Sequence, residues 1–208
     1  MRTALVLLMS GFLLFSCGKK ADTDTSSATT SDNDLLVDAS NRLIAKFGKE
    51  LKSELMAAMS DGGAENAISV CQLKAPEIAK ANSGQYWSIV RVSDKNRNPE
   101  NFADDHQMAI LARFADTTGQ TAAYSYEWSE QQPKIFRYYK PIMTAPLCLK
   151  CHGPIDQLEP GVKAALQEKY PDDKATGYDV DQLRGMFVVE VLWPEGKEFA
   201  EQLVADTL

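Results

Sequence analysis

The sequence predicts a single α+β domain, in which helices come first and an antiparallel sheet with further helices follows. In residues 35–59, apolar side chains recur in steps of three, four or seven, and a second apolar stripe runs over 67–78; both have the spacing of helices. Four later segments have the alternating or continuously apolar patterns of strands: 87–93, 124–128, 135–142 and 186–192. Because helices precede strands, we expect an α+β domain whose sheet is covered mainly on one side.

The first predicted helix covers residues 35–59, and Gly62 and Gly63 end it. A second helix follows, and its apolar stripe includes Cys71, so this thiol is predicted to face inward. Pro76 has no amide hydrogen and clashes with the preceding turn. We therefore expect a kink or a restart just after Cys71.

The remaining elements follow from turn residues and periodicity. Segments 124–128 and 135–142 flank a turn, which predicts an antiparallel hairpin. Within the second segment, Tyr138 and Tyr139 are adjacent, so one of them faces the core or a cofactor and the other does not. Shorter helices are predicted at 104–114, 161–170 and 195–204.

The N-terminus is typical of an exported bacterial lipoprotein. Residues 1–16 form a signal peptide, because their apolar run is too short for a membrane-spanning helix of ~20 residues. Cys17 follows a small residue, as in a lipobox, and is the predicted lipidation site. An ordinary signal peptide with a stray cysteine is the alternative. Residues 17–34 contain no large apolar side chain and are predicted to be a flexible tether.

Length and charge set further bounds. The chain of 208 residues leaves 35–208 as one domain. Its 22 Lys and Arg are outnumbered by 29 Asp and Glu, and the net charge of −7 is spread along the chain, which argues against a nucleic-acid partner. Gly18 is not the aspartate that retains lipoproteins at the inner membrane, so we expect attachment to the outer membrane, facing the periplasm.

The segment Cys148-x-x-Cys151-His152 has the spacing of a c-type haem attachment site. Two thiols at this spacing add to the two vinyl groups of one porphyrin, and the adjacent histidine becomes an axial ligand of the iron. One such segment predicts one covalently bound haem c. Export is consistent with this prediction, because c-type attachment is completed outside the cytoplasm.

Three alternatives compete for these cysteines. An oxidising compartment permits a disulfide between Cys148 and Cys151. A thioredoxin-like redox site would need a βαβ unit, which the pattern does not contain. A zinc site would add Cys71 and His152, but Cys151 and His152 are adjacent and point apart.

The second axial position has several candidates in the sequence: Cys71, His106, a methionine, or no protein ligand. His106 lies at a polar helix start, where a solvated or capping histidine is the simpler interpretation. Cys71 lies on an apolar stripe, where a small buried hydrophobic residue is the simpler interpretation. The residues alone leave this choice open.

Six segments occur in the order of one known family, and the sequence resembles the Tll-type c-haem family through them. The resemblance runs from about Asn66 to Val191, which is most of the predicted domain. The segments are Asn66-Ala-Ile-Ser-Val-Cys71 with Ala75-Pro76, Arg91-Val-Ser with Arg97-Asn-Pro-Glu-Asn, Arg137-Tyr-Tyr-Lys-Pro-Ile, Cys148 to Gly153, Tyr170-Pro-Asp, and Leu183-Arg-Gly.

The resemblance implies a PAS-like fold and a haem bound between His152 and a cysteine thiolate, which matches Cys71. An anionic sulfur ligand favours ferric iron and a low reduction potential. Arginine forks bind carboxylates such as the haem propionates, and Arg91, Arg97 and Arg184 are candidates. We single out Arg91 and Tyr139 as cofactor contacts in addition to the iron ligands.

These features predict a non-enzymatic exported haem protein, either a redox or gas sensor or a low-potential electron carrier. Its partners are then the membrane, through the lipid on Cys17, and a redox or signalling protein that the sequence does not identify. The alternative is a small periplasmic haem enzyme with peroxidase or nitrogen-oxide chemistry. It would need an open distal face with acid/base residues, and His106 is the only other histidine.

Overall fold

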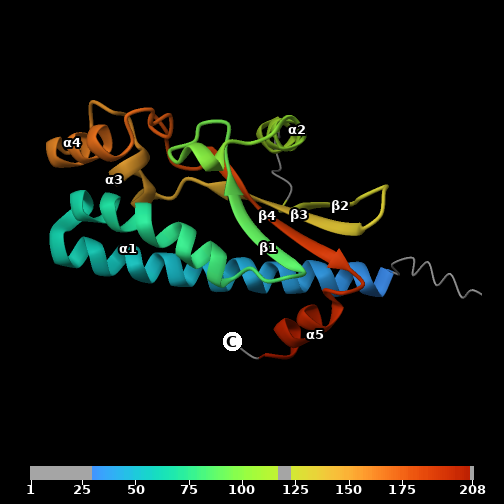
Figure 1. The fold of residues 1–208 in the computed structure, drawn as a ribbon. Coiled ribbons are helices and arrows are strands. Elements are labelled where there is room, and N and C mark those ends of the chain that lie inside the picture. Colours follow the sequence, from blue (N-terminus) through green and yellow to red (C-terminus); the bar gives the residue numbers. More distant parts are fainter. Residues whose placement is uncertain (1–29, 117–122, 207–208) are drawn as a thin grey trace, which may run out of the picture.

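The centre of the molecule is a four-stranded antiparallel sheet with strand order β1-β4-β3-β2, seen in the computed structural model of Figure 1, which describes residues 30–116 and 123–206. The long strands β3 and β4 pair over ten positions, and β2 and β3 form the predicted hairpin. The strands are β1 (Trp87–Val92), β2 (Ser125–Trp128), β3 (Lys134–Met143) and β4 (Leu183–Trp193).

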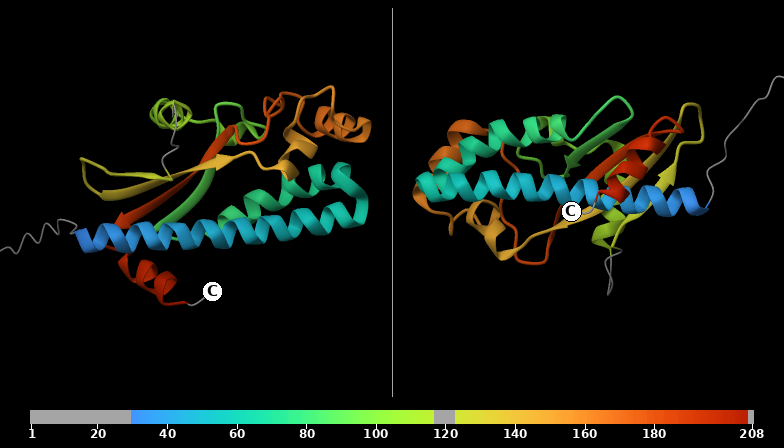
Figure 2. Two further views of the ribbon diagram at one scale, coloured as in Figure 1. Left: turned by 180° about the vertical axis from the view of Figure 1, so that it is seen from behind. Right: turned by 90° about the horizontal axis from the view of Figure 1, so that it is seen from below.

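Before the sheet, α1 (Thr30–Ala81) forms a helical hairpin with two arms, as the antiparallel course in Figures 1 and 2 shows. The arms meet at Gly62 and Gly63, which have non-helical dihedral angles. Gly63 has φ 71°, a left-handed conformation that favours glycine, so the predicted helix end is confirmed. The second arm stays helical through Pro76 to Ala81, so the predicted restart after Cys71 is wrong.

The first arm begins earlier than predicted, because residues 31–34 of the expected tether are helical. Asn33 accepts a hydrogen bond from the Trp128 indole at 2.9 Å, and Asp32 lies 3.4 Å from the Lys197 ammonium group. These polar contacts with distant elements anchor a turn that has no large apolar side chain. The predicted signal peptide, Cys17 and the rest of the predicted tether lie outside the described residues. No helix within the described ranges is long and apolar enough to cross a membrane.

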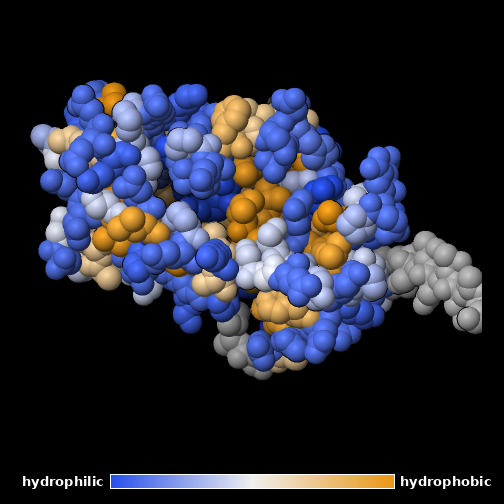
Figure 3. All heavy atoms as spheres, viewed as in Figure 1, coloured by the Kyte–Doolittle hydropathy of each residue, from blue (hydrophilic) through white to orange (hydrophobic). Residues whose placement is uncertain are grey.

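Both faces of the sheet carry a core, where the sequence predicted mainly one. The first arm of α1 packs on one face against alternate residues of the strands, including Ile89, Phe136, Tyr138 and Val189. On the other face, α2 (Asp105–Ala115) covers a smaller cluster that includes Tyr139 and Val188. This α+β arrangement fits a PAS-like fold. Figure 3 shows apolar side chains at the surface between the region of α3 and α4 and that of α2.

The last helices define the two ends of the molecule. α5 (Lys197–Ala205) packs against α1 near one end of the sheet. At the other end, α3 (Leu149–His152) and α4 (Pro160–Lys169) lie beside the second arm of α1 (Figure 1). There Ile68, Val162 and Leu166 form a third apolar cluster, against which Cys151 packs. This cluster fixes the Cys-x-x-Cys-His segment, called the attachment segment below after its predicted role. Two 3-10 turns complete the described chain, η1 (Pro99–Asn101) and η2 (Pro146–Cys148).

Candidate functional site

The Cys-x-x-Cys-His segment lies on two consecutive short turns, η2 and α3, after the long strand β3. Gly153 ends α3 by donating its amide hydrogen to the Leu149 carbonyl at 3.1 Å. A Cβ atom at Gly153 would lie 2.7 Å from that same carbonyl oxygen, so only glycine fits this turn. Cys148 and Cys151 are both free thiols, partly exposed and therefore available for covalent chemistry.

The imidazole of His152 has a fixed orientation. Nδ1 lies 2.7 Å from the carbonyl oxygen of Ala175. Since a carbonyl group only accepts, Nδ1 carries the proton and Nε2 keeps its lone pair. Burial lowers the pKa of His152 well below 6.5, and the positive charges of Arg97 and Arg184 lower it further. The ring is therefore neutral at neutral pH, as a metal-ligating histidine must be.

Cys71, on the second arm of α1, lies at the same place as the attachment segment. Burial raises the pKa of the Cys71 thiol, while the positive charges of Arg91 and Arg97 favour its thiolate. Burial also raises the pKa of Cys151, while the positive charge of Arg97 lowers it and negative charge on Cys71 raises it. The helices that carry these two cysteines, α1 and α3, contact each other. Helix and loop residues that are distant in sequence thus form one site.

The three candidate arginines have different surroundings. Arg97 forms an ion pair with Asp173 at 3.0 Å. Neither Arg91 nor Arg184 has a carboxylate partner within the part of the chain that the structure describes. Burial lowers the pKa of Arg91 to about 10, and the nearby charge of Arg184 contributes to this shift.

The Arg184 side chain has unused hydrogen-bonding capacity. Its Nε is buried without a hydrogen-bond partner among the described residues, and its Nη1 lies 3.5 Å from His152 Nε2. Arg91 and Arg184 are partly buried, and two neighbouring cations withdrawn from water without an acid are costly unless an anion joins them. The site therefore fits a ligand that presents carboxylates beside His152 and Cys71.

The structure separates Tyr139 from the other candidates. Its side chain lies on the face of the sheet that α2 covers, opposite to the face that carries Arg91. The Tyr139 hydroxyl group donates to Glu127 at 2.7 Å, and His106 Nε2 contacts the same carboxylate oxygen at 2.6 Å. Burial raises the pKa of Tyr139. Tyr138 faces α1, where its hydroxyl group donates to Asn41 at 2.9 Å.

Sequence reasoning missed the loop that orients His152. Ala175 acts through its backbone carbonyl, so its residue type carries no signal. Asp173 follows the Tyr170-Pro-Asp segment directly, but nothing in the sequence pairs it with Arg97. Among the described residues, no group of three or more His, Cys, Asp or Glu side chains is arranged to hold a metal ion, so the four side chains of the zinc alternative are not assembled.

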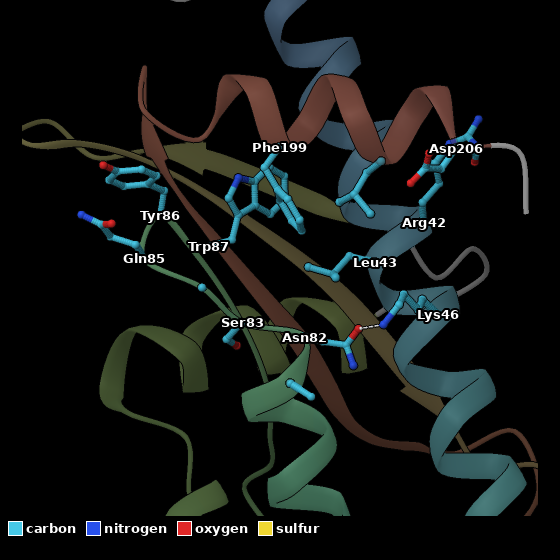
Figure 4. A pocket seen from close by; sticks show the side chains of 13 residues that line it. Arg42, Leu43, Lys46, Asn82, Ser83, Gln85, Tyr86, Trp87, Phe199 and Asp206 are labelled. Carbon is cyan, nitrogen blue, oxygen red and sulfur yellow. Dashed lines mark hydrogen bonds between the residues drawn. The ribbon is translucent and has the colours of Figure 1, made fainter.

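A separate cavity of about 450 Å³ lies between α1, α5 and the start of β1 (Figure 4). Trp87, Phe199 and Leu43 form its apolar wall. Lys46 and Asn82, joined by a 2.7 Å hydrogen bond, lie at its polar side. None of the residues predicted for the site lines this cavity.

Fold and site together describe a PAS-like α+β domain that gathers a Cys-x-x-Cys-His segment, a third cysteine and two arginines without an acidic partner among the described residues. The Tll0287-like family model matches residues 22–191, so the chain belongs to the Tll0287-like family. The resemblance found in the six segments is thereby confirmed. No curated protein matches the chain.

The chain is also similar to a solved structure, described as the crystal structure of the cyanobacterial haem protein Tll0287. The two chains are 26% identical, and the similarity covers 80% of this chain and 98% of the other, with a TM-score of 0.53. The similarity therefore spans almost the whole of the solved relative.

Proposed function

We propose that this chain is an exported haem protein that attaches one haem c through Cys148 and Cys151, with His152 and Cys71 as axial ligands. One observation carries the proposal: Cys71 and two arginines without an acidic partner among the described residues lie at the Cys-x-x-Cys-His segment. There His152 is protonated at Nδ1, and its Nε2 contacts only the Arg184 Nη1 among them, at 3.5 Å. The family relationship to a haem protein supports it. A bound haem would supply one-electron chemistry at its iron.

The surrounding residues have separate roles in this proposal. Arg91 and Arg184 bind the propionate carboxylates, and each guanidinium thereby gains the anionic partner that it lacks. The Ala175 carbonyl holds His152 in one tautomer and makes Nε2 a stronger donor. Cys71 binds as the thiolate, which the positive charges of Arg91 and Arg97 favour. An anionic sulfur ligand stabilises the ferric state and gives a low reduction potential.

With both axial positions filled by protein, the role that follows is redox or gas sensing, or low-potential electron transfer. A haem enzyme would need an acid/base group at an open face of the iron. His106 instead contacts Glu127 on the α2 face of the sheet, and this supports a non-enzymatic role. We further propose that the lipid on Cys17 holds the domain at the periplasmic side of a membrane, preferably the outer one, where it meets a redox or signalling protein.

The test is expression of the full chain in a host competent for cytochrome c maturation. We expect haem that stays bound in a denaturing gel, and a low-spin ferric spin-resonance spectrum with a thiolate signature. Cys148→Ser with Cys151→Ser should abolish the covalent bond, and Cys71→Ser should remove only the thiolate signature. Cys17→Ser is the matched control, because it should release the protein from the membrane and leave the spectrum unchanged. A colourless wild-type protein of apo mass would contradict the proposal.

The ferrous spectra separate the two roles. If Cys71 leaves the iron on reduction, as a redox switch requires, the ferrous spectra of wild type and Cys71→Ala coincide. If the thiolate stays bound, as an electron carrier favours, the two spectra differ. Carbon monoxide binding by the ferrous wild type is the second measurement, because it requires a free axial position.

A further inference from the structure

We propose that Arg97 and Asp173 are a positioning pair that sets the orientation and donor strength of His152. This inference rests on the proposed function, in which His152 ligates the iron. It concerns two residues that do not touch the iron in that proposal. It also gives a physical role to the Arg97-Asn-Pro segment, and to the Tyr170-Pro-Asp segment that leads to Asp173.

A single guanidinium group joins the loop before β4 to the attachment segment. Arg97 Nε donates to Asp173 Oδ2 at 3.1 Å, and Nη2 donates to the Cys151 carbonyl at 2.6 Å and to the Ala175 carbonyl at 3.3 Å. Asp173 Oδ1 in turn accepts from the Ala175 amide at 2.8 Å. The side chains of Arg97 and Asp173 are only 14% and 9% exposed, so solvent screens this network weakly.

These contacts hold His152 from two sides. The Cys151 carbonyl belongs to the residue directly before His152, and the Ala175 carbonyl accepts the hydrogen on its ring. Because the guanidinium fork is planar and rigid, its acceptors have fixed relative positions. Two backbone bonds complete the attachment of the loop, from Tyr178 to the His152 carbonyl at 3.0 Å and from Gly177 to the Gly153 carbonyl at 2.9 Å.

The same contacts also affect the basicity of His152 Nε2, the nitrogen proposed to bind the iron. Ala175 shares its carbonyl oxygen between the His152 ring at 2.7 Å and the Arg97 cation at 3.3 Å. The cation withdraws electron density from the carbonyl, which weakens its pull on the ring hydrogen and limits the basicity of Nε2. Asp173 partly neutralises this cation. Arg97 and Asp173 therefore act on His152 with opposite signs.

Because the two residues act in opposite directions, their variants should shift the reduction potential in opposite directions. Mere loosening of the loop would shift it in the same direction in both variants. In potentiometric titrations of the matured haem protein, Arg97→Gln should lower the reduction potential and Asp173→Asn should raise it. Arg137→Gln and Glu190→Gln are the matched controls, because that pair is joined at 2.6 Å on the α2 face of the sheet. We expect clearly smaller shifts from the controls. Shifts of equal sign for Arg97→Gln and Asp173→Asn, or shifts no larger than the controls, would overturn the inference.

A conservative variant separates geometry from charge. Arg97→Lys keeps the cation but loses the fork. The potential should stay closer to the wild-type value than that of Arg97→Gln. Added imidazole should replace His152 about tenfold more readily, the usual scale for losing such an outer contact of a metal ligand. Replacement at the wild-type level in Arg97→Lys would count against the geometric role.

A measurement on the haem-free chain distinguishes the two proposals. The chain has only two histidines, so nitrogen NMR of labelled histidine resolves His152, with His106 as an internal control. The wild type should show the tautomer protonated at Nδ1, and Arg97→Gln should shift the Nδ1 resonance, because the Ala175 carbonyl then accepts the ring hydrogen more strongly. If no haem is attached but this shift occurs, the proposed function fails and the positioning role stands. If haem is attached and the Nδ1 resonance is unchanged, only the positioning role fails.

Discussion

Charged side chains on the two faces of the sheet differ in how they are compensated. On the α2 face, Arg137 pairs with Glu190 at 2.6 Å, and Glu127 accepts from Tyr139 and contacts His106. At the attachment segment, Arg91 and Arg184 have no acidic partner among the residues described. At the same segment Arg97 does pair with Asp173, so the difference concerns Arg91 and Arg184, which the proposed function assigns to an anionic ligand.

The largest effect that this comparison predicts is a difference between the ferric spectra of variants at the two histidines. His152→Ala should convert the low-spin ferric spectrum of the matured protein to a high-spin one, because Nε2 of His152 is the proposed ligand. His106→Ala should leave the spectrum as in the wild type, because that ring contacts Glu127. Optical and spin-resonance spectra of both variants are the measurement. The comparison fails if His106→Ala changes the spin state.

Arg91 should lower the free energy of unfolding of the haem-free chain and raise that of the haem-bound chain. Its pKa falls from 12.5 to about 10, so keeping the buried cation costs about 3 kcal/mol. Arg91→Met should raise the free energy of unfolding of the haem-free chain by up to that amount, measured in urea, and lower the stability of the haem-bound chain.

The matched control for Arg91 is Arg137→Met. It removes one partner of a half-exposed ion pair and should destabilise both forms by roughly 1 kcal/mol or less. A haem-free Arg91→Met chain that is less stable than the wild type would remove the charge argument for a propionate site.

Acid should destabilise the haem-free chain through His152. Because the folded-state pKa lies well below 6.5, the unfolded chain binds more protons as the pH falls below that value. The stability present above pH 6.5 is therefore lost progressively down to the folded-state pKa. Urea denaturation at several pH values should show this loss, and His152→Gln should reduce it. An unchanged profile in His152→Gln would assign the acid sensitivity to other groups.

The sequence predicted the local elements well because each follows from short-range patterns. The glycine pair between the arms of α1, the β2–β3 hairpin and the order of helices and strands are of this kind. Predictions that needed knowledge of distant partners were less accurate. Residues 31–34 are helical because Asn33 reaches Trp128, and α1 continues through Pro76 in its packed surroundings.

The site shows the same limit. Spacing alone predicted Cys148, Cys151 and His152 as an attachment segment, and family resemblance added Cys71; both stay predictions. We singled out Tyr139 as a cofactor contact, but the structure places its side chain with α2, across the sheet from Arg91. The carbonyl of Ala175 could not be predicted, because a backbone group has no signature in the sequence.

The smallest predicted effect is that of Glu127→Gln on the α2 face. Glutamine keeps an oxygen that accepts from the Tyr139 hydroxyl group and loses only the charge next to His106. The free energy of unfolding should fall by at most about 1 kcal/mol, because a charged contact between such exposed side chains contributes little. The spectrum and reduction potential of the matured protein should not change, because this cluster lies across the sheet from Arg91. A shift in reduction potential as large as that of Asp173→Asn would show that the two faces of the sheet are coupled. The α2 face could then no longer be treated as separate from the ligand site.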